Sequence, residues 1–100
     1  MPMQPRLSPQ TVAVLQELIA APSRWRYGYE LMQATTLAAG TLYPILSRLS
    51  DHGWLESARD TERANNRPPR HLYRLTATGR DGARDMILRA VDVYSHARAR

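Results

Sequence analysis

The chain begins with two segments in which apolar residues recur at helical spacing. Ser8 and Pro9 form a typical helix start, because a serine N-cap accepts a backbone N–H and proline needs none at the first helical position. The apolar positions of this first helix are Val12, Leu15, Leu18 and Ile19, and the turn residues 21–23 end it. A shorter second helix is predicted over residues 27–35, with Leu31 and Met32 facing inward.

The third segment, from about Ala39 to His52, has the sharpest apolar pattern of the chain. Its apolar face consists of Leu42, Ile45, Leu46 and Leu49. The opposite face is small, polar and nearly uncharged, with Ser47 and Arg48 among its residues. Gly53 can adopt the left-handed conformation that ends a helix. Because Pro44 has no N–H for a helical hydrogen bond, we expect a local distortion or a later start of this helix.

Beyond the third helix, apolar and polar residues alternate, which is typical of strands. Two antiparallel strands are predicted over residues 54–59 and 71–75. An irregular basic loop, residues 60–70, joins them. It contains Asn65-Asn66 and Pro68-Pro69, which favour turns and extended backbone.

A last helix is predicted from Thr76, its N-cap, to about Ala97, and its apolar arc is wider than one contact on a small domain needs. The fold class is therefore mainly α with a small β-hairpin, namely a winged helix-turn-helix plus a long C-terminal dimerisation helix. In such a fold the third helix enters the major groove of DNA and the hairpin touches the flanking backbone. We expect a flexible arm over residues 1–7, a DNA-binding domain over 8–76, and a dimerisation helix over 77–100 packed on the same domain.

Composition narrows the classes of protein to which the chain can belong. Its 100 residues suffice for one domain, and the absence of cysteine excludes a disulfide scaffold, a thiolate metal site and a cysteine nucleophile. No stretch has the length and apolarity of a membrane span or a secretory signal, so we expect a cytoplasmic protein without membrane contact. His52, His71 and His96 lack metal-ligand spacing and there is no glycine-rich phosphate loop, so we expect no enzyme, no metal and no cofactor.

The charge of the chain points to a polyanionic partner. Fourteen arginines, no lysine and nine carboxylates give a net charge of +5. The arginines themselves have two explanations, a GC-biased coding sequence or bidentate recognition of phosphates. Their position is more informative, because residues 59–74 carry five arginines against Asp60 and Glu62, a net +3. This distribution favours salt-dependent phosphate contacts from the loop and reading of base edges by the third helix.

Four sequence blocks add a resemblance that covers about residues 8–97. They are GYEL at 28–31, GTLYPIL at 40–46, GWL at 53–55 and RPPRHLYRLT at 67–76. Together they resemble the signature of PadR-family transcriptional regulators, in the short subfamily with a single C-terminal helix. The resemblance implies a homodimer built largely through that helix, a palindromic operator in double-stranded DNA, repression of nearby genes, and often release by a small-molecule effector.

The resemblance also implies roles for individual residues. The expected DNA contacts of the third helix are Thr41, Tyr43, Pro44, Ser47 and Arg48. Those of the wing are Arg63, Asn65, Asn66, Arg67 and Arg70, and Tyr29 is expected to touch a phosphate. The residues expected at the dimer interface are Val12, Leu15, Met86, Ile87, Ala90, Val91, Val93 and Tyr94.

Structural roles remain open for some of these residues. Tyr43 can instead pack beneath its helix, and Asn65-Asn66 can simply form a turn. Arg48 can pair with Asp51 or Glu56 rather than with DNA.

Three further residues are expected to serve the fold. Arg74, within a predicted strand, is a candidate structural ion-pair partner, and Trp25 and Trp54 are expected to pack in the core or at its edge. The alternative function is a winged helix that binds a protein or senses a ligand without binding DNA.

Overall fold

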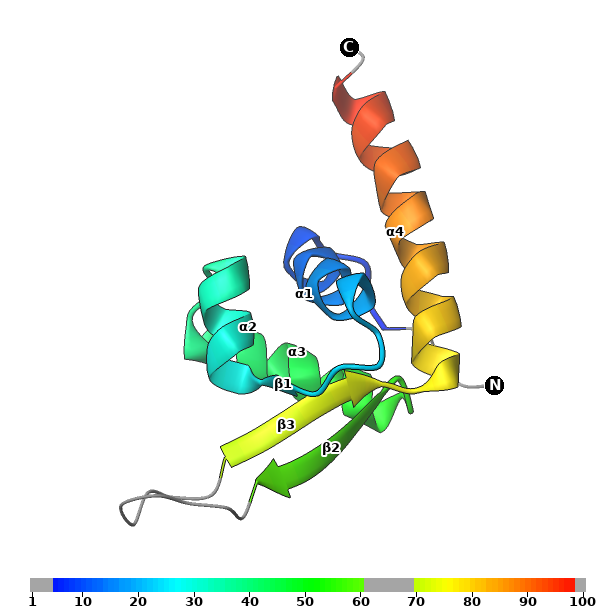
Figure 1. Ribbon diagram of the computed structural model, residues 1–100. Coiled ribbons are helices and arrows are strands. Elements are labelled where there is room, and N and C mark those ends of the chain that lie inside the picture. The colour runs from blue at the N-terminus through cyan, green and yellow to red at the C-terminus, as the bar shows by residue number, and fades with distance from the viewer. Residues whose placement is uncertain (1–4, 61–69, 99–100) are drawn as a thin grey trace.

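The computed structural model describes residues 5–60 and 70–98, with side chains as far as residue 93. Its elements in chain order are α1 (Pro9–Ala20), β1 (Arg26–Tyr27), α2 (Gly28–Thr35), α3 (Ala39–Asp51), β2 (Leu55–Asp60), β3 (Arg70–Leu75) and α4 (Ala77–Arg98). The strands form one antiparallel sheet in the order β1-β3-β2. Figure 1 shows α1, α2 and α3 gathered above this sheet, and α4 running from the end of β3 past α1. The predicted fold class, a winged helix-turn-helix with a long C-terminal helix, is confirmed.

The helices lie close to their predicted bounds. The Ser8 hydroxyl accepts the Thr11 N–H at 3.1 Å and caps α1, and the Thr76 hydroxyl accepts the Gly79 N–H at 2.9 Å and caps α4. α3 begins at Ala39, as the apolar pattern predicted, and passes through Pro44, so of the two alternatives considered for this proline the later start does not occur. Proline removes a single helical hydrogen bond there, and the buried apolar face of α3 stabilises the helix around it.

The sheet differs from the prediction at its ends. Asp60 pairs with Arg70 in the β2–β3 register, so these two residues extend the strands and do not belong to the loop. The two-residue strand β1 was not predicted, because an alternating pattern needs more residues than this. It pairs with β3 through Arg26 opposite Tyr73 and through Tyr27 opposite Leu72.

The core lies between the helices and the upper face of the sheet. Its buried apolar residues are Val12, Val14, Leu15, Leu18, Leu31, Leu42, Ile45, Leu46, Leu49, Trp54, Leu55, Leu75, Ala83, Met86 and Ala90. α1 packs along α4, which brings the first and last helices together (Figure 1). Of the predicted N-terminal arm, Pro5 is buried and Leu7 packs against the core, and residues 1–4 lie outside the described part of the chain.

Trp54 joins the end of α3 to the start of α4. Its N–H donates to the Leu49 carbonyl at 2.9 Å, and Gly53, at φ +75°, has the left-handed conformation predicted for this helix end. The buried side chain lies against the first turns of α4. A Cβ at Gly79 would stand 2.8 Å from the carbonyl carbon of Trp54, and one at Gly82 would stand 2.5 Å from its Cη2 atom. The predicted packing role of Trp54 is confirmed, and both glycines are needed for this close approach.

Candidate nucleic-acid interface

The outer face of α3 presents all five of its predicted DNA-contact residues to solvent, namely Thr41, Tyr43, Pro44, Ser47 and Arg48. Burial of the opposite face against the core fixes the direction in which they point. Within the described part of the chain, Arg48 makes no ion pair with Asp51 or Glu56, and Glu56 pairs with Arg74 instead. The guanidinium of Arg48 therefore remains available to a partner molecule.

Tyr43 lies over the start of α2 and remains 41% exposed. A Cβ at Gly28 would stand 2.6 Å from the Tyr43 hydroxyl oxygen and 2.8 Å from its Cε1, so only glycine permits this approach. Burial, together with the neighbouring Tyr43, raises the pKa of Tyr73. The sequence left packing and exposure of Tyr43 as alternatives, and the structure combines them: one side of the ring rests on α2 and the other faces solvent.

A cavity of about 460 Å³ opens between α2, α3 and the sheet. It is lined by Tyr27, Gly28, Tyr29, Tyr43, Arg70 and His71. Tyr29 is 63% exposed, and its hydroxyl accepts a hydrogen bond of 2.8 Å from the Gln33 amide. The structure thus brings together one predicted contact from each of α2, α3 and the wing, which are Tyr29, Tyr43 and Arg70.

The wing base, defined as Asp60 and Arg70, is held by Tyr27. The Tyr27 hydroxyl donates a 2.5 Å hydrogen bond to Asp60 Oδ2, and the Arg70 guanidinium lies 5.6 Å from the centre of the Tyr27 ring. The hydrogen bond to Asp60 is the main cause that raises the pKa of Tyr27. The other predicted wing residues, Arg63, Asn65, Asn66 and Arg67, lie outside the described residues.

Tyr27 and His71 line the cavity but were not predicted as site residues. Tyr27 was assigned to a helix start, where nothing in the local sequence indicates a partner 33 positions away. His71 was considered only as a metal ligand. The one available signal was the position of His71 directly after Arg70 at the end of the basic segment.

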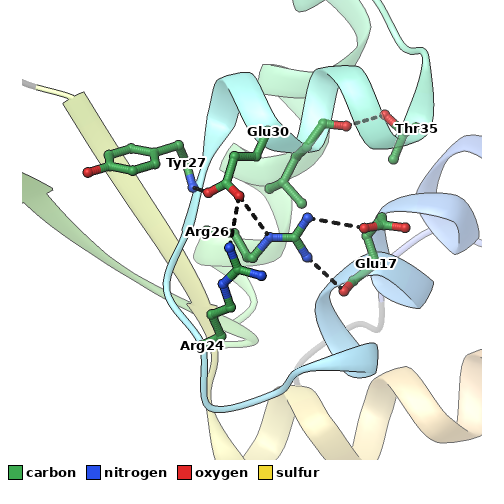
Figure 2. Close-up of polar contacts among 7 residues, drawn as sticks. Glu17, Arg24, Arg26, Tyr27, Glu30 and Thr35 are labelled. Atoms are coloured by element: carbon green, nitrogen blue, oxygen red, sulfur yellow. Dashed lines mark hydrogen bonds and ion pairs between the residues drawn. The ribbon is translucent and has the colours of Figure 1, made fainter.

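A polar cluster ties β1 to the helices on either side of it (Figure 2). Arg26 is only 8% exposed, and its two terminal nitrogens donate to the carbonyl and the carboxylate of Glu17, each at 3.1 Å. Glu30 accepts the Tyr27 N–H at 3.0 Å and lies 3.2 Å from Arg24 and 3.8 Å from Arg26. A buried guanidinium requires such partners, so the cluster fixes β1 between α1 and α2.

Arg74 has the structural role that the sequence left open. Its Nε donates to Glu56 Oε1 at 2.7 Å across the β2–β3 pair, and its guanidinium lies 4.3 Å from the centre of the Trp25 ring. The contact attaches the connection between α1 and β1 to the sheet. Arg74 therefore does not belong to the wing.

The residues expected at a dimer interface fall into three groups. Val12, Leu15, Met86 and Ala90 lie in the protomer's own core, since α1 packs on α4 there. Ile87 is half-buried, whereas Val91 and Val93 are 57% and 50% exposed. The side chain of Tyr94 lies outside the described side chains.

Two further properties concern the described residues alone. They contain no group of three or more histidine, aspartate or glutamate side chains placed to hold a metal ion. A separate finding is that none of the helices in these ranges combines the length and apolarity needed to cross a membrane.

Comparison with known proteins places the chain among regulators of transcription. Residues 17–85 match the profile of the transcriptional regulator PadR-like family. The PcaV transcriptional regulator from Streptomyces coelicolor, solved in complex with its natural ligand, is 26% identical with a TM-score of 0.73, over 92% of this chain and 61% of PcaV. No curated protein sequence matches the chain.

Two other solved structures share the fold at lower identity. A PadR-like transcription factor from Bacteroides fragilis is 20% identical with a TM-score of 0.68, over 89% of this chain and 86% of that one. BpsR from Bordetella bronchiseptica, whose DNA binding is regulated by 6-hydroxynicotinic acid, is 20% identical with a TM-score of 0.71, over 90% of this chain and 64% of BpsR. The chain thus spans less than two thirds of PcaV and of BpsR.

Proposed function

The chain belongs to the PadR-like family of transcriptional regulators, and from this premise we propose that it is a homodimeric repressor that binds a palindromic operator in double-stranded DNA. In this proposal α3 is the recognition helix and presents Thr41, Tyr43, Pro44, Ser47 and Arg48 to the major groove. The wing residues Arg63, Asn65, Asn66, Arg67 and Arg70 meet the flanking backbone, and Tyr29 meets a phosphate.

The proposal depends on one observation, the closeness of the recognition helix and the wing base. Tyr43 of α3, Tyr29 of α2 and Arg70 of β3 line the same cavity. On DNA the major groove and its flanking phosphates are also neighbours, so a single docking position can engage both α3 and the wing base. The nearly uncharged face of α3 then supplies discrimination between base pairs, and the arginines of the wing supply salt-dependent affinity.

The second chain is proposed to pack along α4. Leu88, Val91 and Val93 are 70%, 57% and 50% exposed on this helix, and such apolar side chains are stabilised by burial against a partner. The dimer would set its two recognition helices roughly 34 to 36 Å apart, the spacing of successive major grooves. Sedimentation should give twice the 11.4 kDa of one chain, and a monomer at micromolar concentration would contradict the dimer.

Fluorescence anisotropy with a labelled duplex from the promoter of the protein's own gene tests DNA binding. We expect binding that survives unrelated competitor DNA, and a log–log salt slope of about −5 to −9 if each protomer engages about three to five phosphates. The double variant Arg67→Ala/Arg70→Ala should bind all sequences more weakly and flatten that slope. The matched control Arg6→Ala/Arg84→Ala removes two exposed arginines outside the proposed face and should leave the slope almost unchanged.

Substitutions in α3 test whether this helix discriminates between DNA sequences. Ser47→Ala or Arg48→Ala should change the relative affinities for operator variants by about 1 to 3 kcal/mol per lost base contact, without the uniform loss expected from the wing. If the wild-type chain does not prefer any duplex over competitor DNA, the repressor is excluded and the alternative, a module that binds a protein or senses a ligand, takes its place.

Release by a small molecule completes the proposal. PcaV was solved with its natural ligand, and the DNA binding of BpsR is regulated by 6-hydroxynicotinic acid. 6-Hydroxynicotinic acid is therefore the first compound to screen. An effector should lower the affinity for operator DNA and raise the melting temperature of the free protein, because it binds the folded chain.

A further inference from the structure

The dipeptide Tyr27-Gly28 connects the two elements that are proposed to meet DNA. Gly28 supports the ring of Tyr43 from the recognition helix. Tyr27 contacts both residues of the wing base, Asp60 and Arg70. The distance between the recognition helix and the wing therefore depends on two consecutive residues at the junction of β1 and α2.

The Tyr27 side chain spans the width of the sheet. Its own strand pairs with β3 through Leu72, and its hydroxyl reaches past β3 to Asp60 at the end of β2. The guanidinium of Arg70, at the start of β3, lies over the same ring. One side chain thus contacts the last residue before the basic loop and the first residue after it.

The other end of Tyr27 is attached to the helices. Its backbone N–H donates to Glu30 in the first turn of α2, and Glu30 faces Arg26, which in turn is bonded to Glu17 of α1 (Figure 2). Arg26 is buried, whereas the side chains of Glu17 and Glu30 are 36% and 32% exposed, so this attachment is partly shielded from solvent. Through Tyr27 the wing base is therefore attached to both α1 and α2.

We propose that Tyr27 is a positioning residue for DNA binding: its ring orients the Arg70 guanidinium and its hydroxyl fixes Asp60, which together set the wing against the backbone of the operator. This inference rests on the proposed function. Tyr27 itself need not touch DNA. Tyr27 limits the number of orientations that the wing base adopts in the free protein, so less conformational entropy is lost on binding.

Two substitutions of Tyr27 separate its two contacts. Tyr27→Phe removes the hydrogen bond to Asp60 and keeps the ring beneath Arg70, so operator affinity should fall roughly 3- to 10-fold, as for one lost hydrogen bond. Tyr27→Leu also removes the ring, so affinity should fall further and the salt slope should become shallower by about 1 per protomer as Arg70 loses its phosphate contact. Both quantities come from anisotropy titrations over a salt series.

Asp60 supplies a matched pair of variants. Asp60→Asn and Asp60→Ala both remove one negative charge, but only asparagine keeps an oxygen that can accept from the Tyr27 hydroxyl. Asp60→Asn should therefore bind operator roughly 3- to 10-fold more tightly than Asp60→Ala. In the Tyr27→Phe background this difference should shrink, because the Tyr27 donor is gone.

Ser57→Ala is the control for loss of a hydroxyl from the same sheet, because Ser57 is exposed on β2 and is not among the residues that line the cavity, and it should leave both affinity and salt slope at wild-type values. Circular dichroism at the assay temperature shows whether each variant is folded. If a Tyr27 variant fails to fold, the comparison of Asp60→Asn with Asp60→Ala still tests the hydrogen bond between Tyr27 and Asp60.

The results distinguish this inference from the function on which it rests. If the wild-type chain binds operator while Tyr27→Leu keeps its affinity and slope, or while Asp60→Asn is as weak as Asp60→Ala, the positioning role is overturned and the repressor stands. A wild-type chain that shows no salt-dependent binding to any duplex overturns both.

Discussion

The recognition helix and the wing base face the same side of the molecule, but different interactions hold them there. α3 is fixed by Leu42, Ile45, Leu46 and Leu49, all of which are almost completely buried. The wing base is fixed by a hydrogen bond and a cation–π contact to Tyr27, with the Arg74–Glu56 ion pair further along the sheet. One element is positioned by apolar burial and the other by directional polar contacts.

This difference teaches how a small domain can combine two kinds of DNA contact. Burial of a leucine side chain stabilises by about 1.5 to 3 kcal/mol and is insensitive to salt, so the base-reading helix is held firmly. A polar contact of a half-exposed side chain contributes about 1 kcal/mol or less and depends on salt or pH. The wing base is therefore the element whose position should be changed most easily by substitution.

Leu46→Ala should have the largest effect. It leaves a cavity beneath the recognition helix and should lower the free energy of unfolding by about 2 to 5 kcal/mol, with little dependence on salt. Urea denaturation followed by circular dichroism measures this loss. A loss below about 1 kcal/mol would mean that apolar burial does not hold α3.

Gly28→Ala tests the point where the two regions meet. The added Cβ must displace the Tyr43 ring, whose hydroxyl would stand only 2.6 Å away. Gly28 is the first residue of α2, where alanine gains less than the roughly 1 kcal/mol of a helix interior, so overpacking should lower stability modestly. Operator affinity should fall roughly tenfold, the loss typical of one base contact.

Gly40→Ala is the stability control for this change, because its added Cβ meets no atom within 4 Å and the exposed helix should gain up to about 1 kcal/mol. Unchanged operator affinity in Gly28→Ala would show that Tyr43 does not need its place on α2.

Glu56→Gln should have a smaller effect on stability. The pair with Arg74 is partly exposed, so its loss should cost about 0.2 to 1 kcal/mol at low salt. In about 1 M sodium chloride, where the Debye length is about 3 Å, the difference from wild type should shrink. Melting temperatures of both proteins at low and high salt measure it, and a difference that grows with salt would contradict the ion pair.

Alkaline pH should loosen the wing base through Tyr27. The hydrogen bond to Asp60 raises the pKa of Tyr27 above its ordinary value of 10.0, so the neutral phenol is favoured by folding. The resulting stability is present below about pH 10 and is lost as the pH rises through the folded-state pKa. The free energies of unfolding of wild type and Tyr27→Phe, measured over a pH series, should converge above that pH. A constant difference between the two proteins over the whole series would rule out this bond.

The contrast between apolar burial and polar contacts also explains how far each region could be predicted from the sequence. The apolar period of α3 showed which residues face inward, and the outward-facing residues followed by subtraction, whereas their role in DNA contact came from the family resemblance. The contacts of Tyr27 and Arg26 gave no such signal, because their partners lie on other elements and polar side chains have no period. The two-residue strand β1, which carries both, is too short for any pattern.

The order and type of the elements, the outward face of α3 and the concentration of arginine near the hairpin could all be read from the residues alone. The residues also showed that α4 has a broad apolar arc, but the folded chain was needed to show that Met86 and Ala90 pack within the protomer while Val91 and Val93 stay exposed. Hydrophobic periodicity reports that a face is removed from water, whereas the identity of the covering element depends on how distant parts of the chain come together. The same holds for the junction at Tyr27-Gly28, where helix and wing are joined by contacts that exist only in three dimensions.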